Sequence, residues 1–379
     1  MAANDPAPRP AHASSRWLPA LVLVSCSWSL PGVATDFGLG WTGDFATVAD
    51  GGLEQGSRHM GLVEASFDHA FQWREREIAL HLSGQHRYGG GFSAEEVGDL
   101  QTVSNIDADR GTRLLEAWVA LPLTDHSSLL FGRYDLNGEF DVIEAGGLFL
   151  NSSQGIGPDI SQTGTVGPSI FPNTAFGIRL QHASEQGGAL RLAAIDVDAS
   201  GEYDDGDAPF AGGPMFALEY QWPLEPATVK TGVWRYTRKS DAIGADDRET
   251  QYGGYASLER RIGDRLVAYG RLGAANAAVS RIGFYAGGGV VHTGGLLPDR
   301  DDAIGFSFGY ARNGRSYIDE MADAGEAVTS GEQAYELTWR VPVGDHVVLQ
   351  PDVQYVVDPD SNPGIDDALV FILRVELAL

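Results

Sequence analysis

Apolar and polar side chains alternate with a period of two along much of the chain. At the C-terminal end, every second residue from Leu369 to Leu379 is apolar, and Arg374 and Glu376 stand between them. A period of two places alternate side chains on opposite faces of a β-strand. This segment therefore predicts a strand with one apolar face and one polar face.

The same alternation recurs in segments of about ten residues, which is the length of a membrane-crossing strand. We expect sixteen strands, an even number. They cover residues 36–45, 60–71, 76–86, 112–121, 127–136, 174–183, 189–197, 215–222, 227–237, 250–261, 265–275, 279–290, 302–311, 331–341, 347–357 and 368–377. After residue 34, no segment of the chain has the run of about 20 apolar residues that a membrane-spanning helix needs.

The links between the expected strands alternate in length. Links after the even-numbered strands are tight turns. Links after most odd-numbered strands are long, and they cover residues 46–59, 87–111, 137–173, 198–214, 238–249, 312–330 and 358–367. Short turns at one end and long loops at the other are typical of a transmembrane barrel, whose outward apolar faces lie in lipid. The pattern predicts an all-β fold, a transmembrane antiparallel β-barrel of about 16 strands. A soluble β-sandwich or β-helix is the alternative.

Residues 1–34 have the pattern of a secretory signal peptide. A polar start precedes the apolar run 17–24, and small residues follow it up to Ala34. The run is too short for a membrane-spanning helix. We expect cleavage after Ala34 and export of a single barrel domain, 35–379, to the bacterial outer membrane. A lipobox-like sequence that ends at Cys26 leaves lipidation of this cysteine as an alternative to its removal.

The composition excludes several other classes of protein. The chain has 379 residues with 26 Lys+Arg against 52 Asp+Glu, so its net charge is −26. Only Lys230 and Lys239 are lysines. A negative field of this size repels phosphate and disfavours binding to nucleic acid. One cysteine cannot form an internal disulfide or a paired-cysteine zinc site. Catalytic and phosphate-binding sequence motifs are absent, and we expect no enzyme activity and no cofactor.

Several segments carry a specific order of residues. They read GDF at 43–45, LLEAW at 114–118, LFGRYDLNGEFD at 130–141, FLNSSQGIGP at 149–158, FPNTAFGIRL at 171–180 and NPG at 362–364. In this order they resemble the carbohydrate-selective porin family (OprB type) of Gram-negative outer membranes. The resemblance covers most of residues 36–379 and is densest at 113–180.

The resemblance implies a sixteen-stranded porin through which sugars diffuse passively and selectively in a water-filled lumen. It also implies that the long loop 137–173 folds inward and that the chain assembles as a homotrimer, as in the wider porin class. The partners are then sugars as transported solutes and outer-membrane lipid. One departure is Leu379, where outer-membrane barrels typically end with an aromatic residue. A barrel enzyme, an adhesin and a general cation-preferring porin are the alternative functions.

A sugar path needs paired hydrogen-bonding groups and an aromatic platform for ring stacking. If Leu130, Gly132 and Tyr134 face lipid, the same strand turns Arg133 and Asp135 toward the lumen. The expected substrate path consists of Glu116, Trp118, Arg133, Asp135, Asn137, Glu139, Asp141 and Arg179. The alternative is that these side chains form ordinary ion pairs of the lumen wall, with Trp118 as a packing residue.

An acidic segment near residue 200 resembles the start of a calcium-binding loop. Its candidate ligands are Asp196, Asp198, Ser200, Asp204 and Asp207. The last position holds an aspartate where such loops usually have a glutamate. Asp358, Asp360, Asn362 and Asp366 give a second, looser acidic loop. The alternative for both segments is a solvated acidic loop without metal.

Overall fold

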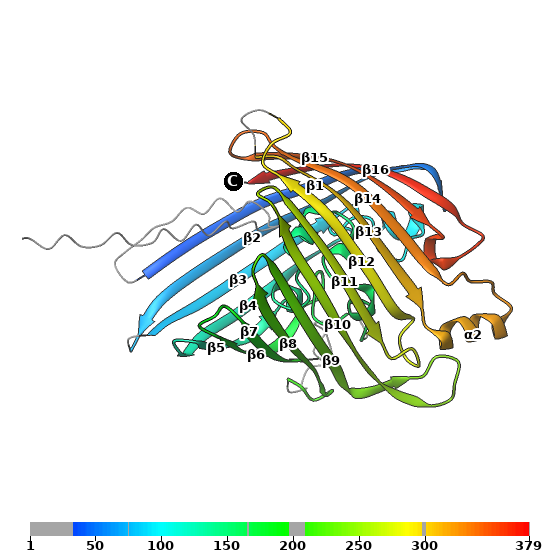
Figure 1. Ribbon diagram of the computed structural model, residues 1–379. Coiled ribbons are helices and arrows are strands. Elements are labelled where there is room, and N and C mark those ends of the chain that lie inside the picture. Colours follow the sequence, from blue (N-terminus) through cyan, green and yellow to red (C-terminus); the bar gives the residue numbers. More distant parts are fainter. Residues whose placement is uncertain (1–32, 75, 165–166, 197–208, 298–300, 379) are drawn as a thin grey trace, which may run out of the picture.

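The computed structural model describes residues 33–378 apart from 75, 165–166, 197–208 and 298–300. Sixteen strands in this part of the chain form one closed antiparallel barrel, in which β1 pairs with β16 (Figure 1). The strands are β1 (Val33–Gly52), β2 (Ser57–Trp73), β3 (Arg76–Tyr88), β4 (Gly111–Thr124), β5 (Ser127–Tyr134), β6 (Ala175–Ala183), β7 (Ala189–Asp196), β8 (Pro214–Leu224), β9 (Ala227–Asp241), β10 (Arg248–Ile262), β11 (Leu266–Ala275), β12 (Ile282–Thr293), β13 (Ala303–Asn313), β14 (Gly331–Pro342), β15 (Val347–Val357) and β16 (Asp366–Ala378). The predicted sixteen-stranded all-β barrel is confirmed.

The first two strands are longer than the alternation predicts. β1 continues to Gly52 and β2 begins at Ser57, so the link between them covers only 53–56. The expectation of a long link over 46–59 is wrong, because backbone pairing continues past the apolar segment to Thr47 and Ser57. With 20 residues, β1 is about twice as long as a lipid crossing requires.

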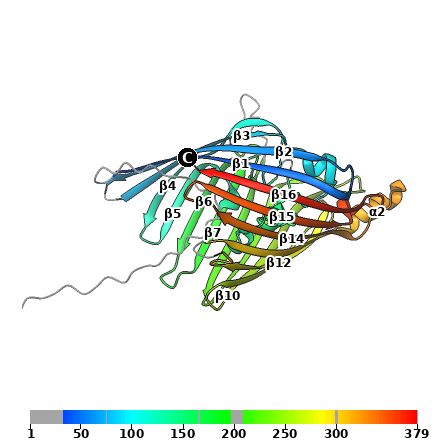
Figure 2. The ribbon, with the colours of Figure 1, turned by 90° about the horizontal axis from the view of Figure 1, so that it is seen from above.

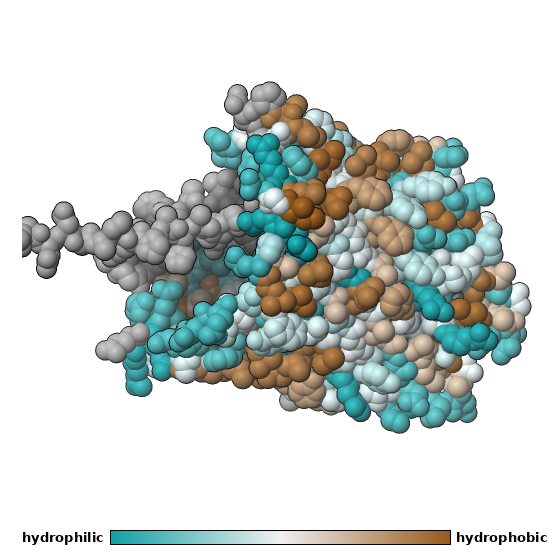
Figure 3. Space-filling model, viewed as in Figure 1, coloured by the Kyte–Doolittle hydropathy of each residue, from teal (hydrophilic) through white to brown (hydrophobic). Residues whose placement is uncertain are grey.

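The outer wall of the barrel carries many apolar side chains (Figure 3). Every strand exposes at least one large hydrophobic side chain, and Leu272 and Phe306, for example, are 57% and 48% exposed. Soluble monomers rarely expose apolar surface on this scale. The wall therefore fits a lipid environment, which is how a transmembrane barrel presents its outward faces.

Two loops fold into the barrel. One covers residues 89–110 and contains η1 (Ser93–Val97). The other covers residues 135–174, and we name it the inner loop. It contains η2 (Leu136–Gly138), η3 (Ala145–Leu148), η4 (Ser152–Gln154) and α1 (Pro158–Ser161). Coiled segments of the inner loop are visible behind the front strands in Figure 1, and Figure 2 shows β16 beside β1, where the barrel closes.

The other helical segments lie in links between later strands. They are α2 (Arg315–Ala324) and η5 (Pro359–Ser361). α2 lies at the end of the barrel opposite the C-terminus (Figure 1). Among the described residues, no helix is long and apolar enough to cross a membrane.

An apolar cluster joins the inner loop to the inner wall of β5–β10. Leu136, Phe140, Ile156 and Ile160 come from the loop. The wall contributes Leu130, Tyr134, Ala175, Ala193, Ile195, Met215, Ala217, Trp234, Tyr236 and Tyr255. This part of the lumen is packed like a protein core, so any open passage lies on another side of the inner loop.

This packing changes the expected orientation of β5. Leu130 and Tyr134 are each 2% exposed and pack in the cluster, whereas Phe131 is 40% exposed on the outer wall. Arg133 shares the face of Phe131 and lies opposite Ala117. The structure therefore turns Arg133 outward, contrary to expectation. The physical reason is that the inner loop provides apolar partners inside the barrel, so both faces of β5 are apolar.

Candidate functional site

A buried ion-pair cluster anchors the inner loop to the barrel wall. Arg271 on β11 lies between two loop carboxylates, 2.7 Å from Asp141 and 2.6 Å from Asp159. Its guanidinium also stands over the rings of Tyr255 and Tyr285, at 5.4 and 5.3 Å from their centroids. Asp141 is 1% exposed. The structure thus gives Asp141 an anchoring contact away from the expected substrate path.

Carboxylates of the wall also hold the loop backbone. Glu336 on β14 accepts hydrogen bonds from the backbone N–H groups of Leu150 and Asn151 at 2.6 and 3.2 Å. Glu219 on β8 accepts one from the N–H of Asp141 at 2.9 Å. These contacts bind the inner loop to the side of the barrel formed by β8–β14. The side formed by β2–β4 keeps half-buried polar side chains.

Aromatic and polar side chains form a line along the inner faces of β3 and β4. In the strand register, His81 lies opposite Trp118, and Ser83 lies opposite Glu116. The rings of His81 and Trp118 stack with centroids 5.0 Å apart. The indole N–H of Trp118 donates to Glu116 Oε1 at 3.0 Å. The wall therefore presents an aromatic surface next to a carboxylate.

The inner loop begins against this line. The backbone N–H of Asp135 donates to Glu116 Oε1 at 3.1 Å. His81 connects the cluster further, since its Nδ1 lies 2.8 Å from Asp68 and its Nε2 lies 3.5 Å from Glu116. The side chains of His81 and Glu116 keep 15% and 21% of their surface exposed. The structure thus brings Glu116, Trp118 and Asp135 together, and it adds Asp68 and His81.

Glu139 and Arg179 form a second polar contact between the loop and the wall. Arg179 Nε and Nη2 donate to the two oxygens of Glu139 at 2.6 and 2.7 Å. Tyr134 donates its hydroxyl to the same carboxylate at 2.7 Å. The Arg179 side chain is 6% exposed and that of Glu139 is 24% exposed. The pair therefore fixes the loop to the wall. Of the two side chains, the Glu139 carboxylate is the more exposed.

Two other expected path residues have structural contacts. The Arg133 guanidinium donates to the backbone oxygen of Thr174, at the end of the inner loop. Asn137 donates through its side-chain amide to the carbonyl oxygens of Phe140 and Gly155, at 3.1 and 3.2 Å. Both residues thus shape the loop, and neither adds a free group to the line on β3 and β4.

Two arginines extend the line toward the long-loop end of the barrel. Arg87 on β3 is 3% exposed, and its Nη1 has no hydrogen-bond partner among the described residues. Arg113 on β4 donates to the side-chain oxygen of Asn173. The sequence reasoning did not select His81 or Arg87. The signal was present, because alternation places both on the same face as Gln85.

The calcium candidates are only partly covered by the structure. Asp196 ends β7, is 5% exposed, and accepts a hydrogen bond from the N–H of Phe210 at 3.0 Å. Asp198, Ser200, Asp204 and Asp207 lie outside the described residues. In the part of the chain that the structure covers, no group of three or more His, Cys, Asp or Glu side chains is arranged to hold a metal ion. The calcium site stays a prediction.

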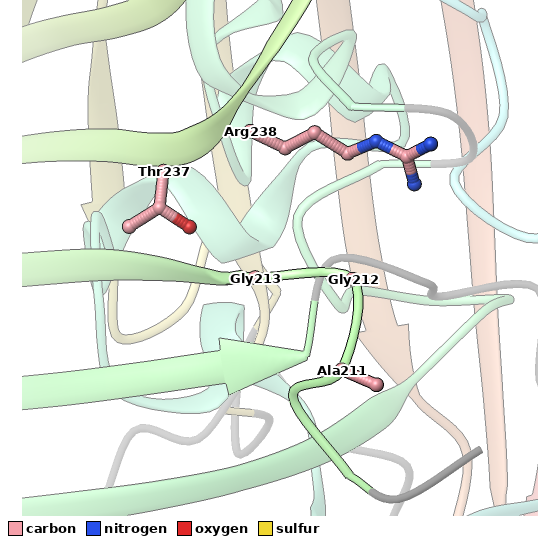
Figure 4. A pocket seen from close by; sticks show the side chains of 5 residues that line it. All are labelled: Ala211, Gly212, Gly213, Thr237 and Arg238. Atoms are coloured by element: carbon pink, nitrogen blue, oxygen red, sulfur yellow. The ribbon is translucent and has the colours of Figure 1, made fainter.

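A cavity at the rim lies apart from the line on β3 and β4. Its lining consists of Ala211, Gly212, Gly213, Thr237 and Arg238 (Figure 4). Thr237 points toward Gly213 in this view and donates its hydroxyl to the carbonyl of Pro214 at 2.8 Å. The lining contains one guanidinium and neither an aromatic ring nor a carboxylate, so it lacks the platform that a sugar path needs.

Asp135 is expected to ionise within the pH range over which electrical recordings of the channel can be made. Burial, followed by the negative charge of Glu116, raises the pKa of Asp135 from 3.8 to about 7. As pH rises through this value, the carboxyl group ionises and adds a negative charge beside Glu64 and Glu116. We therefore expect the preference for cations over anions to increase between about pH 5 and pH 9.

Reversal potentials in a potassium chloride gradient, recorded at each pH, measure this preference. The Asp135→Asn variant isolates the carboxyl group from its titratable neighbours, and it should show a smaller change across the same pH range. An identical pH dependence in both proteins would show that Asp135 does not titrate there.

The family model described as "Carbohydrate-selective porin, OprB family" matches residues 61–379. No curated protein sequence matches the chain. Among solved structures, the high-pH structure of Pseudomonas putida OprB superposes with a TM-score of 0.78 and 16% sequence identity, over 91% of this chain and 94% of that chain. This similarity extends over the whole barrel and shows a shared fold.

More distant porins share the barrel as well. The outer membrane channel DcaP of Acinetobacter baumannii superposes with a TM-score of 0.60 and 11% identity, over 93% of this chain and 99% of that chain. A mutant of the Rh. blastica porin superposes with a TM-score of 0.56 and 13% sequence identity, over 90% of this chain and 100% of that chain. These proteins are channels rather than enzymes. The family model covers most of the chain, and the chain therefore belongs to the carbohydrate-selective porin family, OprB.

Proposed function

We propose that the chain is an outer-membrane porin through which sugars diffuse passively, and that they pass along the inner wall of β3 and β4. The observation that carries this path is the set of Trp118, Glu116 and His81 beside the start of the inner loop. An aromatic face suits the apolar face of a sugar ring, and carboxylates accept hydrogen bonds from its hydroxyl groups. Arg113, which is exposed, supplies donors on the same wall.

The barrel fold and the family indicate an outer-membrane protein. Export through a signal peptide cleaved after Ala34 and assembly as a homotrimer are parts of the proposal. Val33 and Ala34 pair with Phe71 and Ala70 at the start of β1, so this cleavage would shorten the strand by two residues. The proposed function involves no chemical step and no cofactor.

The same wall favours cations over anions in ion conductance. Four carboxyl groups lie near one another there, on Glu64, Asp68, Glu116 and Asp135. Within the described residues, neither an arginine nor a lysine forms an ion pair with any of the four, and only His81 contacts two of them. Uncompensated negative charge on a channel wall raises the local concentration of cations. We include this preference in the proposal as a property of the same channel.

Liposome swelling tests the proposed function directly. Vesicles that contain the protein should swell in isotonic glucose and other monosaccharides without any energy source, and empty vesicles should not. Swelling should fall as the size of the sugar increases. A protein that is folded in the vesicles, yet permits swelling with none of the sugars, would contradict the porin function.

Replacing Trp118 with alanine is expected to slow sugar entry by up to about tenfold, because aromatic stacking contributes on the order of 0.5–1.5 kcal/mol. Ion conductance should stay the same or rise, since a large side chain is removed from the wall. The matched control is Trp222→Ala, which removes an indole from the outer wall, where Trp222 is 38% exposed. An equal effect of both substitutions on swelling would place the proposed path elsewhere.

A further inference from the structure

Three cationic side chains gather on the outer face of the β9–β10 hairpin, near its long-loop end. In the strand register, Arg235 lies opposite Tyr252, Lys239 opposite Thr250, and Arg248 opposite Asp241. Residues two apart in a strand share a face, and Tyr252 is 52% exposed on the outer wall. Arg235, Lys239 and Arg248 are all exposed. We name these three side chains the outer cationic cluster.

Few of the charges in the cluster are engaged in ion pairs. Its single ion pair joins Arg248 Nε to Asp241 at 3.1 Å, and the Asp241 side chain is 91% exposed. Among the described residues, no carboxylate forms an ion pair with Arg235 or Lys239. Lys239 and Arg248 instead donate to each other's backbone oxygens, at 3.2 and 2.6 Å. Like charges held this close repel each other, so an anion between them would be stabilising.

The neighbours of the cluster place it near the boundary between lipid and water. Arg235 also lies opposite Phe216 of β8, which is 51% exposed. Exposed aromatic residues on a membrane barrel mark the boundary between lipid and water, and arginine and lysine reach the lipid headgroups from there. The hairpin turn belongs to the barrel end that carries α2 and the long loops (Figure 1). In a porin this end faces the outside of the cell, so the cluster is level with the headgroups of the outer leaflet.

We propose that Arg235, Lys239 and Arg248 bind a phosphate group of a phosphorylated glycolipid in the outer leaflet, of the lipid A type. Guanidinium groups bind phosphate through paired hydrogen bonds, and each nearby cation adds to the attraction. The adjacent Phe216 and Tyr252 favour a lipid-borne phosphate over a free one, because they offer apolar surface to acyl chains. Arg238 is not included, since it lines the rim cavity (Figure 4). The inference rests on the outer-membrane location and is independent of the sugar path.

Native mass spectrometry of the intact barrel in detergent tests this proposal. The probes are bisphosphorylated lipid A, its enzymatically dephosphorylated form, and inorganic phosphate. The test variant carries Arg235→Gln, Lys239→Gln and Arg248→Gln. The matched control carries Arg260→Gln, Arg261→Gln and Arg265→Gln, which removes three exposed cations at the opposite end of the same region of the barrel.

The wild-type protein and the control should retain bisphosphorylated lipid A and bind the dephosphorylated form much more weakly. The test variant should lose affinity on the order of 100-fold, because each removed cation weakens attraction to an anionic lipid by a few-fold. Equal losses in the two triple variants would overturn the proposal. So would equal binding of both lipid forms, or displacement of the lipid by inorganic phosphate at the same concentration. Sugar swelling should be unchanged in the test variant, which separates this inference from the porin function.

Discussion

Replacing Arg271 with leucine is expected to detach the inner loop from the barrel wall and to widen the channel. The guanidinium lies between Asp141 and Asp159, and the side chains of all three residues are at most 3% exposed. Leucine would leave two buried negative charges without a partner, which typically destabilises a protein by about 3–5 kcal/mol. These carboxylates can regain hydration only if the loop moves toward the water-filled space. The loop is therefore expected to leave β11, and the size limit for sugars should rise.

Planar-bilayer recordings and swelling with a sugar series measure this change. Arg271→Leu should increase single-channel conductance and current noise, and it should admit disaccharides and trisaccharides faster than the wild type does. The control is Arg340→Leu, since Arg340 pairs with Glu376 on the wall at 2.8 Å and the pair is partly exposed, at 28% and 15%. Adding Asp141→Asn and Asp159→Asn to Arg271→Leu should restore part of the stability, because no buried charge is then left alone. Wild-type conductance in Arg271→Leu would contradict the anchoring role.

The number of strands and their faces could be predicted where only one face is apolar. In β16, for example, Phe371 and Leu373 are 45% and 43% exposed on the outer wall, and Arg374 is buried inside, as alternation predicts. In β5 the same reasoning gave the opposite face, because Leu130 and Tyr134 pack against the inner loop. Alternation reports two different faces. It does not report which face meets lipid when a loop fills the lumen with apolar side chains.

The candidate site shows the same limit. Glu116 and Trp118 were predicted together because they share a face of one strand, and the structure places them in contact. Asp141 was expected near them, yet its partner Arg271 lies 130 residues further along the chain. A contact of this kind depends on how the barrel closes and where the inner loop turns. Neither is encoded in a local pattern, so loop anchors and loop-lined paths could not be assigned from the sequence.

Replacing Arg374 with leucine is expected to weaken the seam at which the barrel closes. Arg374 on β16 lies directly opposite Asp44 on β1, and it donates to both carboxylate oxygens at 2.8 Å. Its Nη2 also donates to the side chain of Asn105 at 2.8 Å, which ties the loop 89–110 to the seam. Asp44 is fully buried. The substitution would leave this carboxylate without its cation, at a cost of about 3–5 kcal/mol.

Folded outer-membrane barrels often resist detergent until heated, so the temperature at which the protein unfolds on a gel measures the effect. Arg374→Leu should unfold at a clearly lower temperature than the wild type. Combining it with Asp44→Leu should recover much of the loss, because replacing both members of a buried ion pair by apolar side chains is often neutral. The control is Arg281→Leu, which removes a partly exposed pair with Asp360 and should cost about 1 kcal/mol or less. If the control lowers the unfolding temperature as much as Arg374→Leu does, the contact between Arg374 and Asp44 stabilises the barrel no more than a partly exposed ion pair. If it does not, the closure of this barrel depends on one buried arginine that also holds a lumen loop in place.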